Sequence, residues 1–94
     1  MKLIVYTKPV GCQACRIMKK WLRGRDIFFE ERLIEEYRDE LLEAGFTSSP
    51  VVELLDDNGE ELVKFSGFSE QQLKVTEHYI REEQTTYNVG SNNN

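Results

Sequence analysis

Two cysteines separated by two residues stand where a short apolar run gives way to a helical pattern, and this junction restricts the possible folds most. Residues 3–6 are all apolar and end at the loop sequence Thr-Lys-Pro-Val-Gly, which predicts a strand buried on both faces followed by a loop. Apolar residues then recur at helical spacing from Ala14 to Leu22, and Gly24 follows as a helix stop. Cys12 and Cys15 are therefore expected where a strand passes into a helix.

The rest of the chain continues the alternation and then adds a hairpin. Residues 27–34 predict a second strand and residues 35–44 a second helix ended by Gly45. Residues 51–55 and 60–65 predict a hairpin around an Asn-Gly turn, and Ser69 caps a final helix. The order βαβαββα predicts an α/β fold with a four-stranded mixed sheet flanked by three helices. We expect one domain over residues 1–83 and a disordered tail over residues 84–94.

Charge is distributed unevenly over this acidic chain of net charge −5. Residues 1–25 contain seven basic residues and no acidic one, whereas all 17 acidic residues follow. Either this is an ordinary basic helix face, or it favours the thiolate forms of the two cysteines. The net charge argues against general binding to nucleic acid or anionic membranes. Because the first apolar run is too short for a signal peptide and no stretch is long enough to span a membrane, we expect a cytoplasmic protein.

The two cysteines carry the strongest chemical signal. In a reducing compartment such a pair is more often redox-active or metal-binding than a permanent bridge. At a helix start, Cys12 would face the free backbone N–H groups, which lower the pKa of a thiol, while Cys15 would lie one turn inward. We therefore predict that Cys12 attacks a substrate disulfide and Cys15 resolves the mixed disulfide, with no bound cofactor. A structural zinc site would need four ligands, and the only histidine, His78, lies far away on the last predicted helix.

The roles of two further segments cannot be assigned from their neighbouring residues alone. Pro50 immediately precedes the third strand, so it is either a plain loop proline or part of the site. Gly67 fits a turn before the last helix, with Phe68 as a hydrophobic staple beside the Ser69 cap. Trp21 is expected in the core.

Taken together, these segments resemble the glutaredoxin-like NrdH redoxins over nearly the whole chain. The matching runs are Val-Tyr-Thr-Lys-Pro at residues 5–9, Cys-Gln-Ala-Cys at 12–15, Ser-Pro-Val-Val at 49–52 and Ser-Gly-Phe at 66–68. The resemblance implies a thioredoxin fold in which Pro50 is a cis-proline lying against the dithiol and the backbone of Ser49 pairs with substrate. The substrate-binding residues expected on this basis are Lys8, Ser49, Pro50, Ser66, Gly67 and Phe68.

The same resemblance implies specific partners. Members of this family supply electrons to class Ib ribonucleotide reductase and are re-reduced by thioredoxin reductase with NADPH, and we expect a monomer. Glutaredoxins typically carry a Gly-Gly-x-Asp-Asp segment for glutathione, which residues 66–70 lack. The sequence departs from the family in having both Val10 and Gly11 before Cys12, where one residue is usual. The alternatives are a glutathione-dependent glutaredoxin and a module that binds metal or an iron–sulfur cluster.

Overall fold

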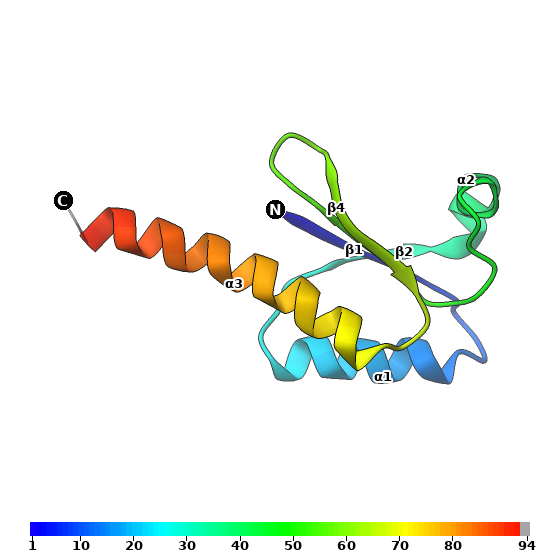
Figure 1. Cartoon of the computed structure of the whole chain (residues 1–94). Coiled ribbons are helices and arrows are strands. Elements are labelled where there is room, and N and C mark those ends of the chain that lie inside the picture. Colours follow the sequence, from blue (N-terminus) through cyan, green and yellow to red (C-terminus); the bar gives the residue numbers. More distant parts are fainter. Residues whose placement is uncertain (93–94) are drawn as a thin grey trace.

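The order of helices and strands follows the predicted alternation. The computed structural model describes residues 1–92, and the side chains of residues 1–83. Figure 1 shows the elements in chain order: β1 (Lys2–Thr7), α1 (Gln13–Gly24), β2 (Glu30–Leu33), the 3₁₀ helix η1 (Ile34–Tyr37), α2 (Arg38–Glu43), β3 (Val51–Leu55), β4 (Glu61–Ser66) and α3 (Glu70–Asn92). The predicted four-stranded mixed sheet with three α-helices is confirmed.

The expected division between domain and tail falls late in α3. The side chains of residues 84–94 and the whole of residues 93–94 lie outside the described residues, so the boundary at residue 83 stays a prediction. Within the part of the chain that the structure describes, no helix has both the length and the apolar character needed to cross a bilayer.

Strand β1 occupies an inner position in the sheet, whose order is β2-β1-β3-β4. It pairs in parallel with β2 and antiparallel with β3, so that Val5 lies opposite both Glu31 and Val52. Helices then cover both faces of this inner strand, which explains why its sequence is continuously apolar rather than alternating. The prediction of a strand buried on both faces is confirmed.

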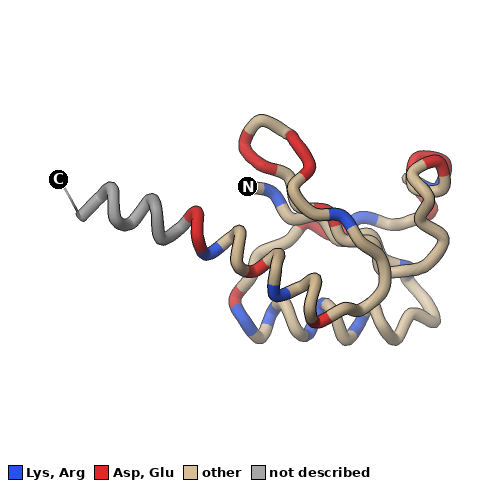
Figure 2. Tube along the Cα trace, viewed as in Figure 1, with Lys and Arg blue, Asp and Glu red and all other residues tan. Residues whose placement is uncertain are grey.

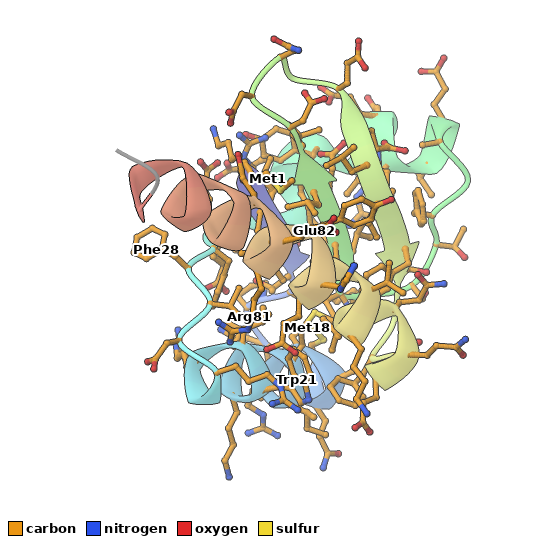
Figure 3. All side chains as sticks on the ribbon, turned by 60° about the vertical axis from the view of Figure 1, so that its left-hand side comes forward. Met1, Met18, Trp21, Phe28, Arg81 and Glu82 are labelled. Carbon is orange, nitrogen blue, oxygen red and sulfur yellow. A yellow bond between two sulfur atoms is a disulfide. The ribbon has the colours of Figure 1, made fainter. Side chains whose placement is uncertain are left out.

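The alternating side chains of β1 belong to two separate cores. Figure 1 shows α1 and α3 on one face of the sheet and α2 beyond the other. On the first face, Leu3 and Val5 pack with Met18 and Leu22 of α1 and with Leu73 of α3. Figure 3 shows Met18 and Trp21 on α1. On the second face, the buried residues are Ile4, Tyr6, Leu41 and Val51.

Local signals placed the hairpin strands and the start of α3 to within a residue, whereas β2 begins only at Glu30 and residues 34–37 form η1 instead of the start of the expected helix. The Ser69 hydroxyl accepts a hydrogen bond from the Gln72 backbone N–H at 3.3 Å, as a helix cap requires. In the hairpin turn Gly59 has a φ of +82°, a conformation that a glycine adopts without steric cost. The end of α1 differs from the expected glycine stop. Gly24 is the last helical residue, but the left-handed conformation falls on Asp26, with a φ of +56°.

The end of β1 is tied to β2 by a polar contact. The buried Thr7 hydroxyl donates to Glu31 Oε2 at 2.6 Å, and the Lys19 ammonium lies 3.0 Å from the same oxygen. The Thr7 hydrogen bond, followed by Lys19, lowers the pKa of Glu31 below its usual value. This contact fixes the strand end from which the loop to Cys12 departs.

Replacing Thr7 by valine should remove this hydrogen bond and lower the free energy of unfolding by about 1 kcal/mol at neutral pH. Because the folded-state pKa of Glu31 is depressed, its stabilising contribution is present above the unfolded-state pKa and is lost as the pH falls through the folded-state value. Urea unfolding at neutral pH and near pH 3 measures the difference in the free energy of unfolding between the native protein and the variant. A difference between native and variant protein that stays constant across that range would contradict the assignment.

Candidate active site

Cys12 and Cys15 meet at the N-terminus of α1, where the loop after β1 turns into the helix. Cys12 is the N-cap residue, with extended backbone, and Cys15 lies in the first turn. The two sulfurs are joined in a disulfide, with the Cα atoms 5.3 Å apart. Cys15 is 2% exposed, whereas Cys12 is only partly buried. A substrate can therefore approach the first sulfur and not the second.

The surroundings of Cys12 favour negative charge on its sulfur. The backbone N–H of Cys15 donates to Cys12 Sγ at 3.1 Å, and the first turn of α1 contains no acidic residue. The Ser49 hydroxyl oxygen lies 3.4 Å from the same sulfur. Once the disulfide is reduced, the helix N-terminus and these donors stabilise a thiolate at Cys12 over the neutral thiol.

The loop before β3 lies directly beside the disulfide. The Ser49–Pro50 peptide bond is cis, as the resemblance implies, and Pro50 is fully buried. The Gly67 backbone N–H donates to the Pro50 carbonyl oxygen at 2.8 Å, and Gly67 has a φ of +80° that favours glycine. The Ser48 hydroxyl donates to the Ser66 hydroxyl at 3.0 Å. The segments around residues 49 and 67, distant in sequence, thus form one surface next to Cys12.

For the remaining candidate residues the structure shows no hydrogen bond to either sulfur among the described side chains. Lys8 is exposed and lines a small groove, and Phe68 is 38% exposed in the loop before α3. Trp21 is half-buried against the core, as expected, with the Arg25 guanidinium 4.1 Å from the centre of its ring. His78 is exposed on α3 and pairs with Glu82. The described side chains include no group of three or more placed to hold a metal ion.

Two features of the site were not anticipated from the sequence. One is the contact of the Ser49 side chain with Cys12, since only the Ser49 backbone was assigned a role. The other is a groove of about 110 Å³ between α2 and the loop before Pro50. Its lining residues are Lys8, Ile34, Arg38, Leu41, Leu42, Phe46, Thr47, Ser48 and Val51. The sequence signal for this groove was the adjacent pair Leu41-Leu42 in a short helix. Because neighbouring helical residues point in different directions, Leu41 is buried while Leu42 remains 50% exposed.

A partly exposed sulfur at a helix N-terminus, bonded to a buried one and flanked by a cis-proline loop, defines a thiol–disulfide oxidoreductase of the thioredoxin fold. The chain is 36% identical over 72 residues to the glutaredoxin-like protein NrdH of Lactococcus lactis subsp. lactis and to that of subsp. cremoris. Each match covers 73% of this chain and 90% of the relative. The chain belongs to the glutaredoxin-like NrdH family.

Solved structures agree with this assignment. The NrdH-redoxin of Escherichia coli, described as glutaredoxin-like with a thioredoxin-like activity profile, superposes with a TM-score of 0.64 at 26% identity. That match covers 79% of this chain and 93% of the other. Oxidised mitochondrial thioredoxin 3 of Saccharomyces cerevisiae shares the fold, with a TM-score of 0.57 at 23% identity over 79% of this chain and 73% of the other. No family model matches the sequence.

Proposed function

We propose that the chain is an electron donor that reduces a disulfide of ribonucleotide reductase, or of another protein, and is itself re-reduced by thioredoxin reductase at the expense of NADPH. The observation that carries this proposal is the unequal burial of the two sulfurs. Cys12 is accessible for attack, and Cys15 is held within bonding distance beneath the surface. The two partners are suggested by the resemblance to the glutaredoxin-like NrdH redoxins described above.

The reaction needs only the two thiols of the reduced protein. The Cys12 thiolate attacks one sulfur of the substrate disulfide, which forms a mixed disulfide and releases the other substrate sulfur as a thiolate that takes up a proton. Cys15 then loses its proton and attacks Cys12 Sγ, which breaks the mixed disulfide and frees the second substrate thiol. The substrate disulfide gains two electrons and two protons, and the protein ends in the disulfide form seen here.

The surface around Cys12 suits a polypeptide substrate. We assign Ser49 and Pro50 to the contact with the backbone of the substrate beside its disulfide, because their loop flanks Cys12. Ser66 and Gly67 support that loop from β4 through their bonds to Ser48 and Pro50. Lys8 lines the groove that also includes Ser48, and Phe68 directly follows Gly67, so we assign both to contacts with residues flanking the substrate disulfide.

Thioredoxin reductase is favoured over glutathione as the reductant for two reasons. The sequence Ser-Gly-Phe-Ser-Glu at residues 66–70 lacks the Gly-Gly-x-Asp-Asp segment that helps glutaredoxins bind glutathione. The related redoxin from E. coli is described as having a thioredoxin-like activity profile. Both observations support a protein reductant.

A paired assay tests the proposal. The oxidised protein is supplied either with NADPH and thioredoxin reductase or with NADPH, glutathione and glutathione reductase, and reduction of a ribonucleotide reductase disulfide is measured. We expect rapid turnover in the first arm and slow turnover in the second. Faster turnover with glutathione would instead identify a glutathione-dependent glutaredoxin, and metal or colour that copurifies in place of reductase activity would identify a binding module.

The Ser49 hydroxyl should make the Cys12 thiol easier to deprotonate. In the reduced protein it can donate a hydrogen bond to the Cys12 thiolate, so Ser49→Ala should raise the pKa of the Cys12 thiol relative to the native protein. Alkylation of Cys12 just below neutral pH should then slow about threefold, since a hydrogen bond to a partly exposed charged group contributes about 1 kcal/mol. Alkylation rates measured across pH give both quantities.

Ser48→Ala is the matched control for this variant. Ser48 is the preceding residue, and its hydroxyl bonds to Ser66 rather than to a cysteine. The control should leave the alkylation profile of Cys12 unchanged. If the two alanine variants titrate alike, the Ser49 hydroxyl has no specific effect on the thiolate.

A further inference from the structure

Helix α1 carries a row of positive charges on its solvent side that begins next to the disulfide. Arg16, Lys20 and Arg23 are all exposed, whereas Cys15, Met18 and Leu22 on the opposite side of the helix are buried. None of the three cations forms an ion pair with any of residues 1–83. Their neighbour Lys19, by contrast, is paired with Glu31. We call Arg16, Lys20 and Arg23 the basic row.

Nine of the 17 acidic residues lie in two regions away from this row. Figure 2 shows Lys and Arg along α1, and Asp and Glu on the hairpin turn and around α2. The acidic residues in these two regions are Glu35, Glu36, Asp39, Glu40, Glu43, Asp56, Asp57, Glu60 and Glu61. At physiological ionic strength a charge is screened beyond about 8 Å. A molecule that docks on Cys12 therefore meets the local positive charge of α1 rather than the net negative charge of the whole protein.

Apolar side chains accompany the basic row near the disulfide. Val10, in the loop before Cys12, is 84% exposed, and Ile17 on α1 is 46% exposed. Phe68, 38% exposed, follows the Gly67 whose N–H binds Pro50. Exposed apolar groups beside unpaired cations are typical of a surface that binds another protein. The apolar contacts contribute affinity, and the charges orient the partner and raise the rate of association.

We propose that the polypeptide whose disulfide Cys12 attacks presents acidic side chains beside that disulfide, and that these bind the basic row. This inference rests on the proposed function and specifies the chemistry of the partner. With a rise of about 1.5 Å per helical residue, Arg16 to Arg23 lie roughly 6 to 16 Å along α1 from Cys12. An extended peptide advances about 3.3 Å per residue, so the acids would stand about two to five positions from the attacked cysteine.

The test compares two disulfide-bonded peptides that differ only in having Glu or Gln at the positions two to five residues from the cysteine. The second-order rate constant for reduction by the reduced protein is measured in low and high salt. At low salt we expect the Glu peptide to react about tenfold faster, because opposite charges steer association. In about 0.5 M salt the preference should fall to about twofold or less.

Matched variants locate the effect on α1. Replacing Arg16, Lys20 and Arg23 together by Gln should abolish the preference for the Glu peptide, taken as the ratio of the two rates, so that any effect of these charges on the Cys12 thiolate itself cancels. Replacing Lys2, Lys74 and Arg81 together by Gln removes the same charge from positions that are also exposed but lie outside the basic row. This control variant should keep the preference for the Glu peptide. Loss of that preference in both triple variants would show an effect of net charge and would overturn the inference.

The remaining outcomes separate this inference from the proposed function. Failure to reduce either peptide would overturn both. Equal reduction of the two peptides by the native protein would overturn this inference alone and leave the proposed function standing. Dimerisation at low salt that depends on the basic row, without any peptide preference, would show that the row binds a second copy of the chain and would also overturn the inference.

Discussion

The Cys12→Ser variant will reduce a protein disulfide at least about a thousandfold more slowly than the native protein, because it lacks the only accessible sulfur of the pair. The Cys15→Ser variant will behave differently. It retains the attacking thiolate at the start of α1, so it will form a mixed disulfide with the substrate and stop there. Stopped-flow reduction of an oxidised substrate measures the first effect, and mass spectrometry of the trapped complex measures the second.

The two serine variants control one another, since each removes a single sulfur from the same helical turn. Both should remain folded, which circular dichroism can verify. Trapping by Cys12→Ser instead of Cys15→Ser would reverse the assigned order of attack. Full activity in either variant would contradict the two-thiol reaction altogether.

Replacing Met18 by alanine is expected to have the largest effect on stability. Met18 is completely buried between α1 and the sheet, one turn beyond Cys15, and packs in the larger core (Figure 3). Removing its buried side chain should lower the free energy of unfolding by about 2 to 5 kcal/mol. In a domain of this size that corresponds to a fall in Tm of at least about 10 °C, measured by thermal unfolding of the oxidised protein.

Ile17→Ala is the matched control, because Ile17 is the adjacent residue on α1 and is 46% exposed. Its replacement should change the Tm by only a few degrees. Comparable losses for the two variants would mean that α1 does not bury Met18 in the way described. Below its melting temperature Met18→Ala should still reduce disulfides, since Met18 makes no contact with substrate.

The fold was predictable largely because its signals are local. The unbroken apolar run of residues 3–6 indicated an inner strand, and the structure places alternate residues of that run in two different cores. The helical spacing after Cys12 located α1, and the Ser69 cap located the start of α3. Each of these features depends on residues within a few positions of one another, so the sequence alone contains the necessary information.

The parts of the site that were missed depend on contacts between distant residues. Ser49 is 37 positions from Cys12, and only the assembled sheet brings its hydroxyl to the sulfur. The groove beside α2 likewise combines Lys8 with Phe46 and Val51 from separate segments. At the end of α1, Gly24 was the obvious candidate for a left-handed residue, yet the chain turns two residues later at Asp26.

The outer strands of the sheet also affect how this protein meets other chains. An outer strand exposes backbone N–H and C=O groups on one side, and these can template unwanted strand pairing. Here β2 has only four residues, three of them charged, and β4 carries Glu61 and Lys64. The charges on both strands, together with the short length of β2, make them poor templates for aggregation. An oxidoreductase with such edges can meet a disulfide substrate at Cys12 without its sheet joining that of the other chain.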